Sequence, residues 1–289
     1  MHEWSPEQLV DETRARRLIA EQCFEPRTLR PLGEGWDNTV WLVDERWAFR
    51  FPRRELAVPG VRREIALLGT LADVLPLPIP QPVWVGAPSD AFPWPFFGAP
   101  VLAGREAPEA EVDRAALGRP LGEFLSALHA ARVDVSLPRD PMGRGHMPVR
   151  VDRTLASLRD VAPYWEAPRG VYDALEDARE LSPPGRVVVH GDLHVRHLLI
   201  DGGAISGVID WGDACHGDPC IDLVLYWALL SEAGRAAFRE AYGPVTEEQL
   251  LCGRVLAWNL GAVLLVYAVK EGFAALAREV RAGLERTTG

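Results

Sequence analysis

The sequence predicts an α+β protein of two lobes, with an antiparallel β-sheet in the N-terminal lobe and a mostly helical C-terminal lobe. Short runs rich in branched and aromatic residues lie before residue 100, whereas longer stretches after it carry apolar residues at helical spacing. A proline-dense section, residues 76–100, ends in Ala-Pro-Val-Leu-Ala-Gly at 99–104, where we expect the hinge. The predicted lobes are therefore residues 1–100 and 101–289.

Length and charge limit the class of protein. At 289 residues and 48% hydrophobic content, the chain can bury a sizeable core and divide into two lobes. The net charge of -10 argues against nucleic acid as a partner, because duplex binding depends on Lys and Arg. No basic region followed by an apolar core opens the chain, and the longest apolar run, residues 255–269, is short for a bilayer. We expect a cytoplasmic protein without a membrane partner, in which that run is a buried helix.

Cysteine and lysine usage narrows the candidate sites. The four cysteines are expected to be free thiols, with a zinc site at Cys215, His216 and Cys220 as the alternative. Only Lys270 among the 31 basic residues is a lysine, and the motif G-x-x-x-x-G-K-[ST] is absent. A P-loop is therefore excluded, and arginine, backbone or metal would have to hold any phosphate.

The first half of the chain predicts a helix followed by strands. Ser5-Pro6-Glu7-Gln8 is typical of a helix start, with Ser as N-cap and Gln closing a capping box, and the helix should run to about Glu21. Next comes a segment, residues 32–40, whose glycines would let backbone amides approach phosphate oxygens. Strands are expected at 41–43, 47–51, 83–85 and 96–97.

Helices dominate the prediction after residue 104. The segment 117–130 carries Leu121, Phe124, Leu125 and Leu128 on one stripe, with His129 packed in the core. Further helices are expected at 150–162, 172–181 and 221–230, and within 247–285 after a break at Gly243-Pro244.

A β-hairpin is the local feature that gathers the chemistry. Two apolar runs, 198–200 and 205–209, flank Asp201-Gly202-Gly203, after a strand at 187–189. A four-residue loop would pair Ile200 with Ser206 and put His197 roughly opposite Asp210; a two-residue loop would shift this pairing by two positions. Facing residues have Cβ atoms about 5 Å apart, so both side chains could reach one cation. Asp192 lies in the loop just before the hairpin.

This arrangement suits phosphoryl transfer, which needs a positioned acceptor hydroxyl and metal ions on the phosphates. His190-Gly191-Asp192 together with His197 resembles the catalytic loop of the aminoglycoside phosphotransferase family, H-x-D-x-x-x-x-N, and Ile209-Asp210-Trp211-Gly212 resembles its metal-binding motif. Gly217-Asp218-Pro219 with Asp222-Leu223 is similar to the next block of the family. The resemblance covers nearly the whole chain and is strongest between residues 190 and 222.

The resemblance implies a two-lobed protein-kinase-like fold and a transferase that moves the γ-phosphate of ATP or GTP to a hydroxyl of a small molecule, with an aminoglycoside or macrolide antibiotic as the leading acceptor. Asp192 would be the catalytic base, and Asp210, assisted by His197, would bind Mg²⁺. His194 and Asp213 are candidates for substrate or phosphate contacts. The implied nucleotide-binding residues are Gly33, Gly35, Asn38, Arg50, Glu64, Val101 and Leu102.

Two departures from the family pattern leave alternatives open. Arg50 stands where kinase-like folds carry a lysine that pairs with a helix glutamate, here Glu64. His197 replaces Asn, a departure in which the chain resembles macrolide phosphotransferases, and imidazole suits transition metals better than Mg²⁺. A metabolite kinase for a sugar or amino alcohol and a non-catalytic nucleotide-binding protein are the alternatives. A third is a zinc hydrolase built on the histidines at 190, 194 and 197 and Asp192, although H-x-D-x-H-x-x-H differs from H-E-x-x-H. No sequence feature specifies an oligomeric state.

Overall fold

The computed structural model describes residues 6–35 and 37–289. By its internal contacts this chain forms two compact units. The first holds the described residues up to Asp73, together with Pro78–Leu102 and Trp211–Asp213. The second holds Val74–Leu77, Ala103–Asp210 and Ala214–Gly289. An antiparallel sheet in the first and mostly helices in the second confirm the predicted fold class.

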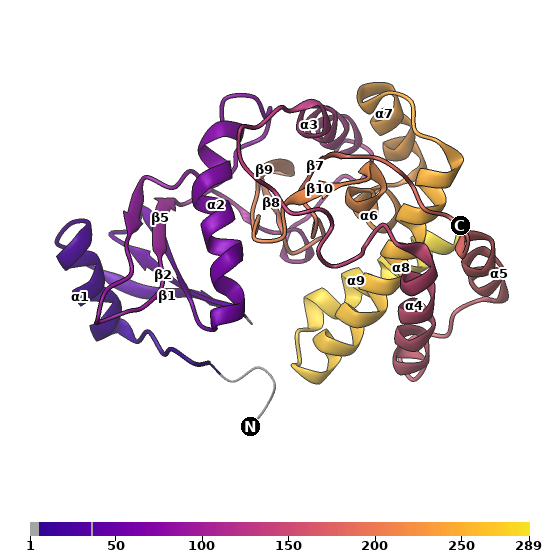
Figure 1. Ribbon diagram of the computed structural model, residues 1–289. Helices are drawn as coiled ribbons and strands as arrows, with labels where there is room; N and C mark the ends of the chain where they lie inside the picture. Colours follow the sequence, from indigo (N-terminus) through magenta and orange to yellow (C-terminus); the bar gives the residue numbers. More distant parts are fainter. Residues whose placement is uncertain (1–5, 36) are drawn as a thin grey trace. The chain divides into compact units, whose positions relative to one another are not determined.

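The N-terminal unit is built on a five-stranded antiparallel sheet of order β1-β2-β3-β5-β4 (Figure 1). Its strands are β1 (Leu29–Glu34), β2 (Asn38–Val43), β3 (Trp47–Pro52), β4 (Trp84–Gly86) and β5 (Phe96–Pro100). Because side chains alternate along a strand, Phe49 and Phe51 of β3 point to one face of the sheet and Arg50 to the other. This alternation decides which residues can join the core and which can join a site.

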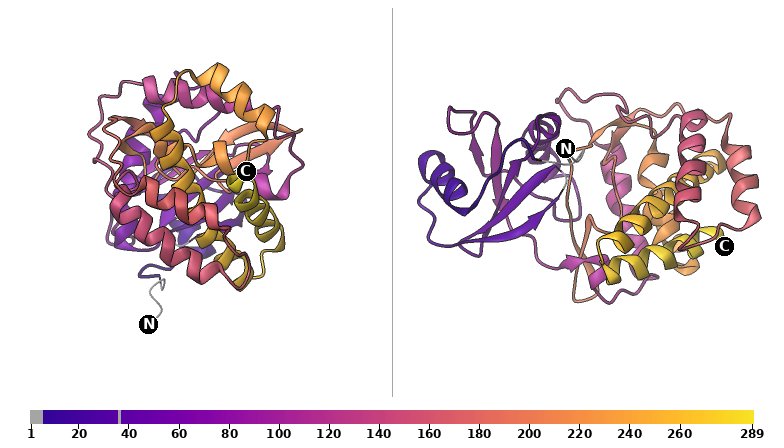
Figure 2. Two further views of the ribbon diagram at one scale, coloured as in Figure 1. Left: turned by 90° about the vertical axis from the view of Figure 1, so that its right-hand side faces the viewer. Right: turned by 90° about the horizontal axis from the view of Figure 1, so that it is seen from below.

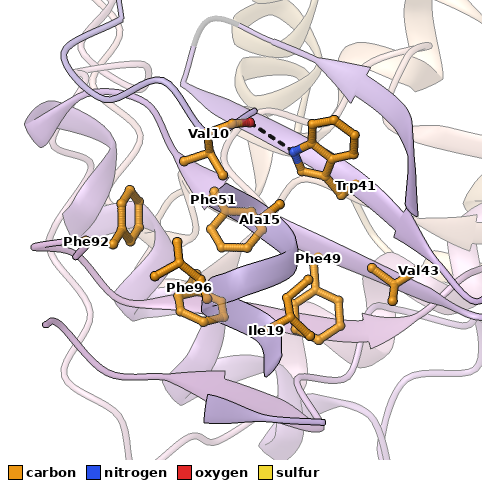
Figure 3. Close-up of a cluster of buried hydrophobic side chains, with 10 residues drawn as sticks. Val10, Ala15, Ile19, Trp41, Val43, Phe49, Phe51, Phe92 and Phe96 are labelled. Atoms are coloured by element: carbon orange, nitrogen blue, oxygen red, sulfur yellow. Dashed lines mark hydrogen bonds between the residues drawn. The ribbon is translucent and has the colours of Figure 1, made fainter. Parts of the chain in front are cut away.

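An aromatic core fills one face of this sheet, beneath helix α1 (Glu12–Gln22). Phe51 and Phe96 stack with ring centroids 4.7 Å apart, and both are fully buried (Figure 3). Trp41 packs there too and donates its indole N–H to the carbonyl of Val10 at 3.1 Å (Figure 3). On the opposite face, Val61 and Ile65 of helix α2 (Val58–Leu71) pack against Phe97. The sheet therefore has one face that carries the aromatic core and another that carries Arg50.

The predicted start of the first helix is wrong. Helix α1 begins at Glu12, with Asp11 as N-cap accepting a hydrogen bond from the Arg14 N–H at 2.8 Å. The backbone N–H groups of Glu7 and Gln8 instead donate to the carbonyl of Arg53, at 2.8 and 3.0 Å. Those bonds tie the segment to the sheet, so a capping box cannot form there; Ser5 lies outside the described residues.

The C-terminal unit is mainly helical, with long helix α8 at its centre. Its helices are α3 (Gly118–Ala130), α4 (Met147–Val161), α5 (Arg169–Ala178), α6 (Val224–Ala228), α7 (Glu232–Tyr242), α8 (Glu247–Lys270) and α9 (Ala274–Thr288). Helix α8 packs against both α4 and α9 (Figure 2). Among the described residues, α8 is the one helix long and apolar enough to cross a membrane, and 61% of its apolar window is buried within the protein. Burial against neighbouring helices accounts for its composition.

The remaining strands of this unit flank the segments that carry the sequence motifs. They are β6 (Arg105–Glu106), β7 (Val187–Val189), β8 (Leu198–Asp201), β9 (Ala204–Val208) and β10 (Cys215–Gly217). Strands β8 and β9 form the predicted hairpin, but through a two-residue loop, since Asp201 pairs with Ala204. Gly202 and Gly203 both have positive φ, 57° and 83°, as a tight primed turn requires. A bulge between Leu199 and Ile200 then shifts the register by one residue.

Candidate active site

An arginine–glutamate pair lies on the α2 side of the N-terminal sheet. Arg50 of β3 donates through Nη1 to Oε1 of Glu64 on α2 at 2.8 Å, and the Glu64 side chain is only 1% exposed. With its amide oxygen turned toward the guanidinium, Asn38 accepts from Nε and Nη2 of Arg50, both at 3.0 Å. Arg50 is thus held in one orientation by a charged and a neutral acceptor, as its planar fork allows.

The segment Trp211–Asp213, which follows the metal-binding motif's aspartate, packs within the N-terminal unit. The Trp211 backbone N–H donates to Oε1 of Glu64 at 3.1 Å, and Nε of Arg63 donates to the Gly212 carbonyl at 3.0 Å. Glu64 therefore binds both Arg50 and the residue after Asp210. Asp213 belongs to the same segment and is half-buried.

The glycine-rich segment forms the connection between β1 and β2. Gly33 pairs with Val40, and the Gly35 N–H donates to the Asn38 carbonyl at 3.0 Å. A Cβ at Gly33 would meet no described atom within 4 Å, and one at Gly35 would meet only the Asn38 carbonyl oxygen, at 3.9 Å. Neither glycine has the positive φ that favours this residue. Packing and backbone conformation thus leave both positions open to a side chain.

Two of the implied nucleotide-binding residues, Val101 and Leu102, follow strand β5. The Val101 N–H donates to the Arg46 carbonyl at 2.9 Å, and the side chain of Val101 is 37% exposed. Leu102 is half-buried and is the last residue of the N-terminal unit before the chain continues at Ala103.

Hydrogen bonds to Asp222 hold the start of the loop that runs from His190 to His197. The Asp222 carboxylate, which is fully buried, accepts the backbone N–H groups of His190 at 2.8 Å and Gly191 at 3.0 Å. His129 of α3 lies 3.2 Å from the same carboxylate through Nε2 and bonds Tyr242 through Nδ1. Burial alone would raise the pKa of Asp222, but the hydrogen bonds from His129 and Gly191 hold that pKa below its ordinary value.

His190 braces the loop rather than facing a ligand. Its Nε2 donates to the Ile209 carbonyl at 3.0 Å, while its Nδ1 accepts the Asp192 N–H at 3.3 Å. One donating and one accepting nitrogen define a neutral imidazole. Complete burial, which lowers the pKa of His190, favours the same form.

Asp192 lies at the centre of the polar cluster in this unit. Arg144 donates from Nη2 to its Oδ1 at 3.2 Å, while Oδ2 lies 3.6 Å from Nε2 of His194 and 3.8 Å from Nδ1 of His197. The rings of His194 and His197 stack with centroids 3.8 Å apart. Burial, followed by the charge of His197, holds the pKa of His194 well below its ordinary value, so this imidazole is neutral at pH 7.

His197 and Asp210 come together across the base of the hairpin. The bulge places Ile209 opposite His197, with a backbone hydrogen bond of 2.9 Å, and Oδ2 of Asp210 then lies 3.4 Å from Nε2 of His197. Because the Asp192 carbonyl can only accept, the 2.8 Å bond to it puts a proton on Nδ1 of His197. Asp210 has φ of 66°, a left-handed conformation that is uncommon outside glycine and typical of functional turns.

Among the described residues, one group of potential metal ligands lies within reach of a single ion: Asp192, His194 and His197, with ligand atoms within 4.8 Å of one another. His190 is not part of it, since both its nitrogens are bonded elsewhere. Cys215 and Cys220 are buried free thiols, as is Cys252. The zinc hydrolase therefore lacks one of its four predicted ligands.

A cavity of about 160 Å³ adjoins Asp192 within the C-terminal unit. Arg144 and Arg150 supply its other charged groups, and leucines at 193, 256 and 260 supply much of its apolar wall. Sequence reasoning missed both arginines, because they lie in a segment without a motif. The signal that marks Arg144 is Asp140, whose two carboxylate oxygens accept the N–H groups of Arg144 and Gly145 at 2.8 and 2.7 Å.

Comparison with known sequences gives a family and two relatives. The model of the phosphotransferase enzyme family matches residues 28–249. Hygromycin-B 4-O-kinase of Escherichia coli is 26% identical over 230 residues, which cover 74% of this chain and 67% of that enzyme. The uncharacterized protein YcbJ of Bacillus subtilis is 43% identical over 56 residues, 19% of this chain and only 18% of that protein.

Solved structures agree on the fold. The GDP and kanamycin complex of APH(2")-IIia has a TM-score of 0.69 at 22% identity, covering 96% of this chain and 99% of that one. Macrolide 2'-phosphotransferase type I has a TM-score of 0.63 at 23% identity, covering 96% and 98%. The predicted kinase-like fold is confirmed, and so is the prediction of a phosphotransferase, because the family model matches most of the chain: it belongs to the phosphotransferase enzyme family.

Proposed function

We propose that this protein is a small-molecule kinase that transfers the γ-phosphate of ATP or GTP to a hydroxyl group. The observation that carries the proposal is the cluster of Asp192, His197 and Asp210, joined by contacts of 2.8 Å and 3.4 Å beside a cavity that reaches Asp192. Aminoglycosides and macrolides are the first acceptors to screen, because the structural relatives carry those names. Sugars and amino alcohols are the second.

The donor set fits a divalent cation. With Nδ1 of His197 donating to a carbonyl, Nε2 of the ring faces a carboxylate oxygen of Asp210 3.4 Å away and, when it carries no proton, presents a lone pair to it. Nε2 of His197 and the Asp210 carboxylate would then be two facing acceptors. A shared cation, either a proton on Nε2 or a metal ion, stabilises such a pair. A backbone carbonyl that holds the other nitrogen is the usual support of a metal-binding histidine. His197 and Asp210 would hold Mg²⁺ or, since imidazole is one ligand, Mn²⁺.

In the proposed reaction Asp192 is the general base that takes the proton of the acceptor hydroxyl. Oδ1 is occupied by Arg144, so Oδ2 receives the hydroxyl proton while the acceptor oxygen bonds to the γ-phosphorus. The bond from that phosphorus to the β,γ-bridging oxygen breaks, and the nucleoside diphosphate leaves with the electron pair. The cation supplies positive charge to the phosphate oxygens when bound. Arg50, oriented by Glu64 and Asn38, and the amides around Gly33 and Gly35 hold the phosphates, while Val101 and Leu102 border the base.

Roles follow for the remaining residues. His194, neutral and packed on His197, orients that ring and lies close enough to Asp192 to contact an acceptor oxygen. Asp213, two residues beyond Trp211, is proposed as a phosphate-side contact of the N-terminal unit. The lobes proposed from the sequence, 1–100 and 101–289, would differ from the compact units in three short segments: Val74–Leu77, residues 101–102 and Trp211–Asp213.

The first experiment is a thermal shift with ATP or GTP in the presence of Mg²⁺, Mn²⁺ or EDTA. A ligand that binds only the folded protein stabilises it by about 2.7 kcal/mol at a hundredfold excess over Kd. We expect one nucleotide to raise Tm in a metal-dependent way, and that nucleotide is then used to screen acceptors by ³¹P NMR. Absence of a shift with both nucleotides would count against the kinase.

Substitution of Gly33 by alanine tests the phosphate-binding loop. A Cβ there meets no described atom within 4 Å, and alanine is preferred to glycine in a strand by about 0.5–1 kcal/mol, so the free protein should keep or slightly raise its Tm. We expect weaker nucleotide binding, because the methyl group occupies space that the phosphates need. Isothermal titration measures the affinity, and the control is Gly69→Ala on α2, where a Cβ also meets no described atom within 4 Å. Unchanged affinity in Gly33→Ala would remove this segment from the site.

A further inference from the structure

The Arg150 guanidinium is buried against the cavity beside Asp192, and no described residue forms an ion pair with it. This side chain of α4 is 8% exposed. It donates to two neutral oxygens: Nη1 to Asn259 Oδ1 at 3.2 Å and Nη2 to the Met142 carbonyl at 3.0 Å. Its Nε is buried and has no hydrogen-bond partner among the described residues, and none of their carboxylates forms an ion pair with it.

Such a charge is costly, because a buried guanidinium has lost its hydration without gaining a counter-ion. Burial first, and then the charges of Arg144 and Arg153, lower the pKa of Arg150 to about 10. Asp140 opposes this shift, but its two carboxylate oxygens accept backbone N–H groups. The local field at Arg150 therefore favours an added negative charge.

The other charges of the cavity do not neutralise Arg150. Arg144 pairs with Asp192, so these two charges offset each other and leave the cavity with one positive charge. The protein as a whole carries a net charge of -10, so this positive lining is a local property. A cationic group placed in the cavity would be repelled, whereas an anion would find a preorganised donor.

We propose that the molecule phosphorylated by this enzyme carries a carboxylate as well as its hydroxyl. The carboxylate binds Arg150, and an apolar body separates it from the hydroxyl. The proposal rests on the kinase function proposed above and narrows its acceptor. Leu256 and Leu260 offer the apolar surface, and a cavity of about 160 Å³ is close to the roughly 150 Å³ that holds a benzene ring. A guanidinium and a carboxylate form two parallel hydrogen bonds, whereas a single neutral oxygen does not form this bidentate pair.

Three compounds of one shape test the proposal: 4-(hydroxymethyl)benzoate, 4-(hydroxymethyl)benzamide and 4-(hydroxymethyl)benzylamine. Each has a benzene-sized body and a primary hydroxyl, and they differ in charge at the far end. Titrated by NMR into the full chain without nucleotide, the benzoate should bind about 10- to 100-fold more tightly than the amide, the ratio that a hydrogen bond to a charged group supplies. The benzylamine should bind more weakly still. Equal affinities, or a preference for the amine, would overturn the proposal.

Variants of α4 test whether Arg150 is the source of the preference for the benzoate. In Arg150→Gln the preference for the benzoate over the amide should disappear, while Arg150→Lys, which keeps a charge but loses the fork, should retain part of it. The matched control is Arg159→Gln, which removes a charge from an exposed position of the same helix that does not act on Arg150, and it should leave the ratio unchanged. A benzoate preference that persists in Arg150→Gln would contradict the proposal. If that variant does not fold, the wild-type ratio and Arg150→Lys still decide.

Nucleotide binding, measured in the same preparation, separates the two proposals. A protein that shows a metal-dependent nucleotide shift but ranks the three compounds equally keeps its kinase function and refutes the anionic acceptor. A protein that prefers the benzoate but binds neither ATP nor GTP supports the anion site and refutes the kinase. Phosphorylation of the benzoate hydroxyl, seen by ³¹P NMR, would support both.

Discussion

Asp192→Asn should lower turnover by about 10²- to 10⁴-fold, the usual contribution of a general base. Asparagine keeps the shape and can still accept from Arg144, but it cannot take the hydroxyl proton. The measurement is slow nucleotide hydrolysis, with water as the acceptor, and then phosphorylation of any acceptor found. The nucleotide-induced rise in Tm should persist, because Asp192 is assigned to the acceptor.

The control for this variant is Asp201→Asn, which removes an exposed carboxylate from the same hairpin and should leave turnover unchanged. Hydrolysis that continues at the wild-type rate in Asp192→Asn would rule out the assigned base. If neither wild type nor variant turns nucleotide over while both bind it, the non-catalytic alternative would hold instead.

Arg50→Met should destabilise the nucleotide-free protein by about 3–5 kcal/mol, the usual cost of removing one partner of a buried ion pair. The Glu64 side chain is 1% exposed, so its charge would remain buried without the guanidinium donors. Urea unfolding followed by tryptophan fluorescence measures the loss. The double variant Arg50→Met/Glu64→Gln should recover most of it, because the amide oxygen can still accept from the Trp211 N–H while the charge is gone.

Arg30→Met is the matched control for that prediction. Arg30 pairs with Glu45 in the same sheet, but both side chains are more than half exposed, so solvent replaces the lost partner and no measurable change is expected. Equal stability of Arg50→Met and Arg30→Met would show that Arg50 and Glu64 do not depend on each other as their burial implies.

Much of the site could be predicted because its parts lie close along the chain. The Asp-Gly-Gly turn specifies a tight hairpin, since both glycines adopt positive φ, and a short hairpin necessarily brings residues near 197 and 210 together. The resemblance to kinase-like folds implied the pairing of Arg50 with Glu64, which lie on a strand and the next helix, 14 residues apart. The register was less certain, because the bulge at Leu199 and Ile200 arises where β8 also pairs with β6.

Other features depended on contacts between segments far apart in the chain. Asp222 supports the loop from His190 to His197 across 32 positions, and Arg144 reaches Asp192 across 48 positions. Arg150 meets Asn259 across 109 residues, because α4 packs on α8. Local propensity and motif spacing carry no information about such pairs; the packing of buried helices sets them. The local sequence therefore determines the turn chemistry and the order of the motif residues. Long-range helix packing instead determines the charge of the cavity beside Asp192, because it buries Arg150 without an ion pair to any described carboxylate.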